Sequence, residues 1–489
     1  MPEQRVIIIG AGLAGSLLAI YLARRGMAVN VFEARPDMRT EAIAAGRSIN
    51  LALSDRGIAA LRAVGMDEYM LAEAVPMYGR MIHTLTGETK LLPYSGRKGE
   101  YINSVSRAGL NIALMNEAEK YPNVQFIFNE RCTDFHLASG EVSFASGRTI
   151  RGDTVIATDG AGSAVRDAME RDLPEFQWSQ VFLEHGYKEL HIPPRNAGVL
   201  PGSNKDLFQL EKNALHIWPR HKFMMIALPN FDGSFTCTLF LAHTGGNLSG
   251  SEGVSSASPA DDTLTTARVS AFEPSFEDLN DESSLREFFT REFPDAVPLM
   301  PTLVEDFFTN PTGNLGTVKC WPWNVEGKVL LLGDSAHAVV PFYGQGMNCA
   351  FEDVRVLDSL LSQPGAVATG PIVDWEFVFE KYGQLRKINT DAIADMAEEN
   401  FYEMRDATAD PVFQRKRELE TKLEQTFPDY FSKYSMVTFR EDLPYSVAKE
   451  KGNAQDRFLM QVCANTESVA EIDIKEVILD LKDIDECLG

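Results

Sequence analysis

The first forty residues follow a strand, helix, strand pattern of apolar and polar positions. The β-branched run 5–9 (RVIII) is typical of a strand that is buried on both faces of a parallel sheet. It leads into a glycine-rich turn at 10–15 and a helical pattern that ends near Arg25, and a second strand at 28–33 ends in Glu33. The pattern therefore predicts an α/β domain that opens with a βαβ unit.

Further along the chain the period changes from that of buried strands to strict alternation. Two short strands are predicted at 79–83 and 91–94, and alternation from about 182 to 241 predicts an antiparallel sheet with one buried face. The stretch 243–270 is rich in Ser, Gly, Thr and Asp and is expected to be a mobile loop. We therefore expect a second, antiparallel domain inserted into the first one.

Beyond 363 the pattern is mainly helical. The predicted elements are one or two helices at 375–406, a charged solvated helix at 415–425, an irregular aromatic stretch at 428–439 and an acidic amphipathic helix at 468–488. The expected organisation is a Rossmann-like domain from 1–75, 100–180 and 318–362, a substrate domain from 76–99 and 181–317, and a C-terminal helical region from 363–489.

Composition narrows the possible partners. The chain has 46 Lys and Arg against 70 Asp and Glu, and the formal net charge of −24 argues against nucleic acid or an anionic membrane as a partner. Six cysteines without CxxC pairs predict neither a disulfide framework nor a metal site, and they fit a reducing cytoplasm. Residues 6–23 lack charge, but their glycines and the strand that follows indicate a nucleotide fold rather than a membrane span or anchor.

Three glycine-containing signals indicate a nucleotide site. Gly10, Gly12 and Gly15 form a GxGxxG pattern between a strand and a helix, and Glu33 lies where this fingerprint places a carboxylate for a ribose. The fingerprint does not distinguish FAD from NAD. Asp159 and Gly160 follow a later strand, and Gly333 with Asp334 follows another, where the carboxylate would accept hydrogen bonds from a polyol.

Two further features concern the same site. The segment Gly344–Asn348 precedes a helix, so its backbone N–H groups could contact an electron-rich ring. Arg107 at a predicted helix start suits a pyrophosphate and a surface ion pair equally well.

These three signals, in this order, resemble the single-component FAD-dependent aromatic hydroxylases over about residues 5–360. Segments 46–53, 79–83, 185–190, 213–219, 341–348 and 434–439 are similar, within that family, to the kynurenine 3-monooxygenases. The resemblance implies an NADPH-dependent FAD monooxygenase that hydroxylates L-kynurenine to 3-hydroxykynurenine with O₂ through a flavin C4a-hydroperoxide. No protein nucleophile or metal is implied.

The resemblance also implies residue roles. FAD would be held by Gly10, Gly12, Gly15, Glu33, Arg107, Asp334, Gly346, Met347 and Asn348. The substrate would be held by Arg80, Tyr94, Asn400 and Tyr434 at its amino-acid end and by Leu215, Phe240, Pro341 and Phe342 along its ring.

Alternatives remain at this stage. A hydroxylase of another aromatic carboxylate, or a non-catalytic flavin-binding redox sensor, shares most of these features. Tyr94 and Tyr434 could be structural residues at a domain seam. The sequence departs from the family at Thr158, often alanine, and at Tyr343, often His or Phe, and its tail lacks the membrane anchor of mitochondrial members.

Overall fold

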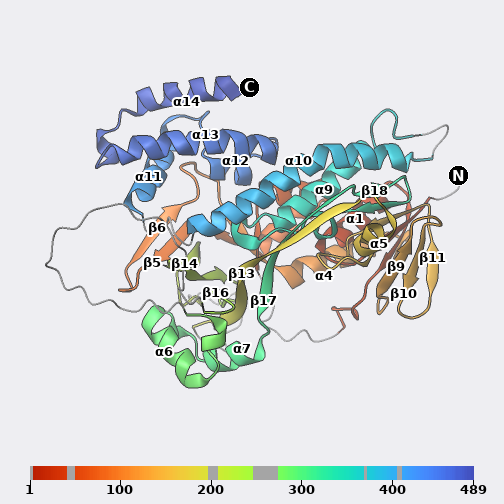
Figure 1. The fold of residues 1–489 in the computed structure, drawn as a ribbon, viewed down its shortest axis with the longest axis horizontal. Helices are drawn as coiled ribbons and strands as arrows, with labels where there is room; N and C mark the ends of the chain where they lie inside the picture. Colours follow the sequence, from red (N-terminus) through yellow and green to blue (C-terminus); the bar gives the residue numbers. More distant parts are fainter. Residues whose placement is uncertain are drawn as a thin grey trace, which may run out of the picture.

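The computed structural model describes residues 4–40, 50–195, 207–245, 274–367, 372–404 and 410–488. The predicted polar loop at 243–270 therefore lies mostly outside the described residues. Figure 1 shows the C-terminal helices above the sheets and α6 and α7 below them.

A six-stranded sheet of order β18-β19-β12-β1-β2-β8 forms the core of the nucleotide-binding fold, and only the β18–β19 pair is antiparallel. Its strands are β1 (Arg5–Ile9), β2 (Ala28–Phe32), β8 (Val124–Ile127), β12 (Thr154–Ala157), β18 (Asn324–Val325) and β19 (Val329–Leu331). The apolar runs predicted as buried parallel strands are confirmed, because β1, β12 and β19 lie side by side in the core.

Helices pack around this sheet and around each other. Helix α1 (Leu13–Arg24) contacts α4 (Arg107–Ala118) and α9 (Gly346–Leu360), and α2 (Asp55–Val64) also packs on α9. The helix expected after the segment Gly344–Asn348 thus begins within that segment, at Gly346. Smaller elements complete this part: α3 (Asp67–Ala72), α5 (Ala164–Asp172), α8 (Asp334–His337), η3 (Pro341–Tyr343), the sheet β3 (Asn50–Leu53), β7 (Ile102–Ser106), β4 (Val75–Met77), and the sheet β11 (Thr149–Arg151), β10 (Glu141–Phe144), β9 (Cys132–His136).

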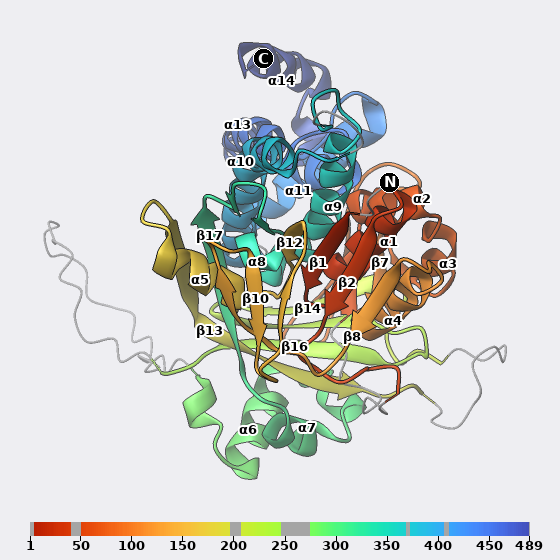
Figure 2. The ribbon, with the colours of Figure 1, turned by 90° about the vertical axis from the view of Figure 1, so that its right-hand side faces the viewer.

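The expected antiparallel sheet is present and has seven strands in the order β17-β13-β16-β15-β14-β5-β6. They are β5 (Gly79–His83), β6 (Thr89–Pro93), β13 (Gln177–Ile192), β14 (Ala214–Arg220), β15 (Phe223–Pro229), β16 (Phe235–Ala242) and β17 (Gly313–Trp321). Every pair is antiparallel except β5 with β14. The sheet crosses beneath the six-stranded one (Figure 2).

Strand alternation gives this sheet two different faces. Arg80 pairs with Leu215 in the β5–β14 register, and both line a cavity on the upper face. The lower face carries Trp218 and Leu239, which pack on α6 (Glu282–Glu292) and α7 (Leu303–Thr309) in a separate apolar core with η1 (Phe276–Asp278) and η2 (Val297–Leu299) beside it.

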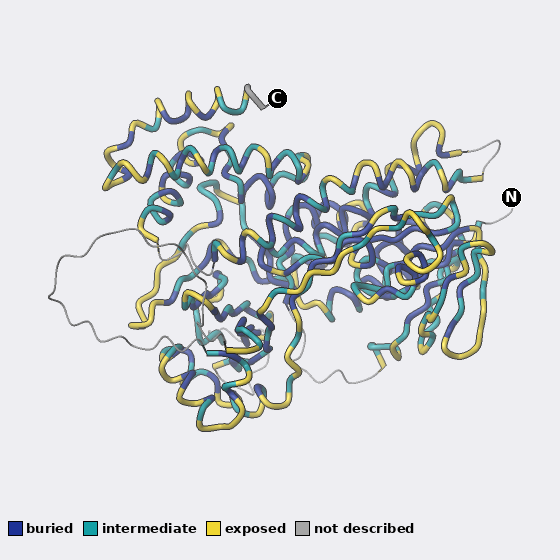
Figure 3. The backbone as a smooth tube through the Cα atoms, viewed as in Figure 1, coloured by how far each residue is buried: buried dark blue, intermediate teal, exposed yellow. Residues whose placement is uncertain are grey.

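The C-terminal region consists of α10 (Trp375–Tyr402), α11 (Pro411–Thr426), α12 (Lys433–Phe439), α13 (Tyr445–Ala464), η5 (Val469–Glu471) and α14 (Ile474–Leu488). Figure 3 shows buried residues gathered where α9 and α10 meet the sheets, whereas α14 has an exposed face. The alternative of a single helix after 375 is confirmed by α10. No helix in the described part of the chain combines the length and the apolar character that a membrane span requires.

Two predictions for this region are wrong. Helix α11 is not a solvated helix, because α13 packs against it and Lys416 and Glu420 are only 4% and 3% exposed. Lys416 pairs across the interface with Asp456 at 2.5 Å, so its charge is met by a residue far along the chain. The stretch 428–439 is not irregular throughout, since α12 forms where Ser432 caps its first turn and the apolar positions are buried.

Candidate active site

A cavity of about 800 Å³ runs between the two large sheets. Its wall contains 14 of the 17 residues predicted to hold FAD or substrate: Gly10, Gly12, Glu33, Arg80, Tyr94, Arg107, Leu215, Phe240, Asp334, Pro341, Phe342, Gly346, Met347 and Tyr434. Gly15, Asn348 and Asn400 are not part of this wall. The structure thus brings together residues from most of the chain.

The first glycine turn leaves a helix N-terminus open to the cavity. Gly10 has φ +100°, and a Cβ there would lie 2.5 Å from the Thr158 carbonyl oxygen. Gly12 is the N-cap residue of α1 and offers no side-chain cap, the first turn has no acidic residue, and a Cβ on Gly12 would point into open space. Backbone N–H groups of α1 are therefore available to an anion such as a pyrophosphate.

Gly15 has a different place from the other two glycines. A Cβ at this position would lie 2.1 Å from the carbonyl oxygen of Gly10 and 2.5 Å from Thr158 Oγ1. The Thr158 hydroxyl donates to the carbonyls of Ile9 and Gly10, at 3.0 and 2.9 Å. Gly15 thus allows the helix to pack against the turn, and Thr158, one of the two departures from the family, fixes that turn.

Glu33 presents an ionised carboxylate at the end of β2. Burial by itself would raise the pKa of Glu33, but hydrogen bonds from Arg35 and from the backbone N–H of Ala11 outweigh it, so the pKa lies below its ordinary value. An ionised carboxylate in the cavity wall can accept hydrogen bonds from sugar hydroxyls.

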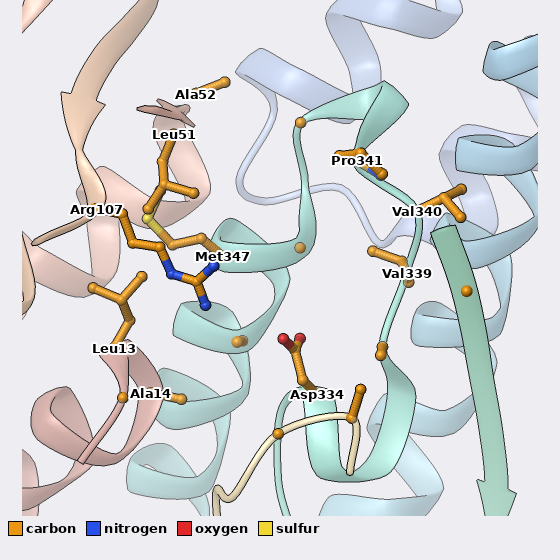
Figure 4. Close-up of a pocket in the computed structure, with 18 of the residues that line it drawn as sticks. Leu13, Ala14, Leu51, Ala52, Arg107, Asp334, Val339, Val340, Pro341 and Met347 are labelled. Carbon is orange, nitrogen blue, oxygen red and sulfur yellow. The ribbon is translucent and has the colours of Figure 1, made fainter. Parts of the chain in front are cut away.

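Asp159 and Asp334, which follow β12 and β19, both line the other side of this part of the cavity. Asp159 accepts from the N–H of Ala164 at 2.9 Å through one oxygen, and its other oxygen is buried without a partner. The buried Arg166 guanidinium donates to the carbonyls of Ala161 and Ser335, which joins the loop after β12 to α8. Figure 4 shows Arg107 and Asp334 extending into the cavity from opposite sides.

Helix α9 supplies a second uncapped N-terminus. It begins at Gly346 without a side-chain cap or an acidic residue in its first turn, and Gly346 and Met347 line the cavity. Asn348 is fully buried and acts on the protein instead: it accepts from Ser54 N–H and donates to the carbonyls of Ala52 and Gly344. Two open helix N-termini, a ribose acceptor and a buried unpartnered carboxylate oxygen fit a dinucleotide with a long polar chain.

The far end of the cavity contains a buried cation among tyrosines. Arg80 is 8% exposed, forms no ion pair with any described carboxylate, and has an unpartnered Nε. Its guanidinium lies 4.9 Å from the ring centre of Tyr434 and 5.8 Å from that of Tyr94. A buried cation without a counterion is costly, so this geometry favours an anionic ligand group.

Three tyrosines stack in a column beside Arg80, which we call the tyrosine column: Tyr94, Tyr434 and Tyr343. The Tyr94 and Tyr434 rings are 5.3 Å apart and nearly parallel, and the Tyr434 and Tyr343 rings are 5.5 Å apart. Burial raises the pKa of Tyr94 and of Tyr343 well above the ordinary value, so both hydroxyls stay protonated. Tyr343, the second departure from the family, lies in η3 and connects this element to the tyrosine column.

Apolar side chains form a slot next to the column. Phe240 and Phe342 have ring centres 4.9 Å apart, and Leu215 and Pro341 also line this part. Asn400 lies behind Phe342 and donates to its carbonyl oxygen at 2.7 Å. It borders a small polar cavity that also touches Arg80, Tyr343 and Tyr434.

Some wall residues were not predicted as site residues. Tyr187 is directly opposite Phe240 in the β13–β16 register, and Thr238 lies two residues before Phe240 on the same face. Strand alternation could have identified both. Met404, just beyond α10, has no comparable signal.

His337 lies beneath the site and not in the cavity wall. Its Nε2 is 2.6 Å from Asp353, near Cys349, and Asp353 also accepts from Arg386 at 2.6 Å. Since the Asp353 carboxylate already accepts from Arg386 and lies against His337, we interpret this group of buried side chains as structural.

Comparisons with known proteins agree with this geometry. Residues 3–208 and 319–368 match the family described as FAD binding domain. The fold is similar to 2-methyl-3-hydroxypyridine-5-carboxylic acid oxygenase, with a TM-score of 0.61 at 18% identity over 86% of this chain and 98% of that one. It is also similar to PqsL of P. aeruginosa, with a TM-score of 0.59 at 18% identity over 82% and 99%. The chain is an FAD-dependent aromatic monooxygenase, and FAD is its cofactor.

Curated relatives give the family. The chain is 46% identical to a kynurenine 3-monooxygenase of Myxococcus xanthus, over 97% of this chain and 95% of the relative. It is 42% identical to one of Dictyostelium discoideum, over 96% of each. The chain belongs to the kynurenine 3-monooxygenase family.

Proposed function

We propose that the protein hydroxylates L-kynurenine to 3-hydroxykynurenine, with NADPH as reductant and O₂ as the second substrate. The observation that carries this proposal is Arg80, a buried cation that forms no ion pair with a described carboxylate, at one end of a cavity whose other end fits FAD. An aromatic amino acid needs such a cation for its carboxylate and an apolar slot for its ring. The cytoplasmic location stays a prediction.

The chain's own residues would bind and orient the reactants. Arg80 would bind the substrate carboxylate, with the hydroxyls of Tyr94 and Tyr434 as neutral partners. Phe240 and Phe342 would hold the ring and exclude water from it. When bound, FAD would supply activated oxygen by the route that the resemblance implies.

Cofactor roles follow the wall of the cavity. Gly10 and Gly12 would contact the pyrophosphate, Glu33 the ribose, and Arg107 and Asp334 the central part of the cofactor. For Gly15, Asn348 and Asn400, the contacts favour support of the neighbouring loops over direct ligand contact. We also propose that the chain is divided into three domains or regions. These are a discontinuous FAD-binding domain (1–75, 100–180, 318–362), a substrate domain (76–99, 181–317) and a C-terminal helical region (363–489).

The function is tested by NADPH oxidation of the FAD-loaded protein with and without L-kynurenine, while 3-hydroxykynurenine and hydrogen peroxide are both measured. We expect kynurenine to stimulate oxidation with matching product. Stimulation with peroxide alone would make kynurenine an effector, and no stimulation would contradict the substrate assignment.

Arg80→Met tests the binding mode. Loss of one partner of a buried charge pair costs about 2–5 kcal/mol, so the Kd for kynurenine should rise at least about 30-fold with FAD retained. Lys188→Met is a matched control, because Lys188 is a buried cation of the same sheet that donates to the Asn310 carbonyl on the opposite face. It should leave kynurenine affinity unchanged, and equal losses in both variants would remove Arg80 from this role.

A further inference from the structure

Arg56 is a completely buried arginine outside the cavity wall, in the first turn of α2. Nothing in its local sequence marks it as functional. All three nitrogens of its guanidinium have partners, which lie on α9, on α12 and in the loop after α12, and both helices contribute to the active site.

One side of Arg56 contacts the flavin-side helix. Its Nη1 donates to the Glu352 carboxylate of α9 at 2.8 Å. Glu352 lies about one and a half turns from Gly346 and Met347, which line the cavity at the start of the same helix. Arg56 is thereby fixed relative to the end of α9 that faces the cofactor.

The other side of Arg56 contacts the end of α12. Its Nε donates to the Val437 carbonyl at 3.1 Å, and its Nη2 donates to the Leu443 carbonyl in the loop that follows. The guanidinium also lies 3.9 Å above the ring centre of Tyr445, the first residue of α13. The Val437 carbonyl is one of the last four of α12, which a helix end leaves without internal donors, and the Leu443 carbonyl lies in the loop beyond it.

Helix α12 is short, and it carries Tyr434 of the tyrosine column. Its start is held from within the C-terminal region, where Ser432 N–H donates to Glu424 at 2.9 Å. Its end is held by Arg56, which belongs to the part of the chain that builds the flavin site. A planar guanidinium can direct donors at a carboxylate and two carbonyls at once, whereas a lysine ammonium cannot reproduce that geometry.

We propose that Arg56 is a positioning residue that sets Tyr434 relative to the flavin-side helix α9. It acts through α12 and touches neither ligand. The proposal rests on the proposed function only for its kinetic readouts, because the hydrogen exchange of α12 can be measured without turnover.

Arg386 offers a matched control within the same buried cluster. It donates to Glu352 at 2.7 Å and to Asp353 at 2.6 Å, and it is 3% exposed. Arg386 therefore shares the Glu352 carboxylate with Arg56 but donates to no backbone carbonyl of α12 or of the loop after it. Arg386→Lys disturbs a comparable buried ion pair without releasing α12.

The experiment compares Arg56→Lys, Arg56→Met and Arg386→Lys as FAD-loaded proteins. Hydrogen exchange of peptides covering 433–443 is measured by mass spectrometry, together with the KM for kynurenine and the ratio of product to NADPH oxidised. For Arg56→Lys we expect at least tenfold faster exchange across 433–443, a KM raised at least fivefold, a lower product ratio and a kcat changed less than the KM. For Arg386→Lys we expect wild-type exchange in 433–443, even if its melting temperature falls.

Two results would overturn the proposal: wild-type exchange at 433–443 in Arg56→Lys, or the same acceleration in Arg386→Lys. Should Arg56→Met fail to fold, Arg56→Lys still decides the question because it keeps the buried charge. If the wild-type protein does not turn over kynurenine, the function fails, while the exchange comparison still tests the position of α12.

Discussion

The two ends of the cavity are built in different ways. The cofactor end is made mainly of backbone: glycine turns, two open helix N-termini, and carboxylates at strand ends. The substrate end is made of side chains, with one cation and a column of three tyrosines that come from four separate segments. A backbone site fails when an atom is added, whereas a side-chain site fails when a charge or hydroxyl is removed.

The largest effect should come from adding one methyl group to the cofactor end. In Gly15→Ala, the new Cβ would lie 2.1 Å from the Gly10 carbonyl oxygen, so the turn must shift. We expect FAD affinity to fall at least about 100-fold and the melting temperature of the apoprotein to fall as well. Gly12→Ala is the contrast, because its Cβ meets no protein atom: it should weaken FAD binding while the apoprotein melts normally. Normal FAD affinity in Gly15→Ala would contradict the comparison.

A fall in pH should destabilise the seven-stranded sheet, through His216, before it protonates Glu33 at the cofactor end. Burial lowers the pKa of His216 from 6.5 to about 4. The unfolded chain therefore binds a proton at His216 more tightly than the folded protein does. The free energy of unfolding decreases as the pH falls from 6.5 towards 4, by about 3 kcal/mol in all. Glu33 has a lowered pKa, so its contribution is intact above pH 4.5 and is lost only below it.

Denaturation at pH 7 and pH 5 measures this difference. His216→Gln, which keeps hydrogen-bonding groups but does not titrate, should lose less stability between these values than the wild type. An equal loss would show that another group controls the acid response.

Removal of the negative charge from Glu33 should have a somewhat smaller effect. Glu33→Gln weakens the hydrogen bonds to Ala11 N–H and Arg35 and the expected one to ribose, so FAD affinity should fall about 10- to 100-fold. Flavin fluorescence measures this Kd. Once loaded with FAD, the variant should bind kynurenine with the wild-type Kd. A large change in this Kd would show that the two ends of the cavity do not act independently.

The smallest effect should come from a single hydroxyl of the tyrosine column. Tyr94→Phe keeps the ring stacked on Tyr434 and removes a neutral hydrogen-bonding group, so the KM for kynurenine should rise about 2- to 10-fold. The Kd for FAD should not change. An effect as large as that of Arg80→Met would mean that the column, and not the cation, dominates binding.

The same contrast explains what the sequence could predict. The cofactor end lies in contiguous motifs, and backbone conformation is a local property, so β1, α1, Glu33 and the loop after β19 could be placed from the pattern alone. Arg80 and Tyr94 could be paired because β5 and β6 form a hairpin. Asn400 and Tyr434 were linked to Arg80 only by resemblance, since no local pattern connects them to it.

The wrong predictions have the same origin. The charges of α11 are typical of a solvated face, but Asp456 on α13 pairs with Lys416 and buries it. Arg56 was not suspected because its partners lie almost 300 residues or more along the chain, which no short-range pattern reveals.

The order of these segments along the chain has a consequence for biosynthesis. Every described residue that lines the cofactor end has been made once translation passes Ala350, whereas Tyr434, the middle ring of the tyrosine column, is made later. Because domains fold as units during synthesis, FAD can bind to the residues of the cofactor end before Tyr434 of the substrate end has been synthesised. A ligand that binds early stabilises the fold that holds it, so cofactor supply in the cell is expected to govern how much of the chain reaches its final form.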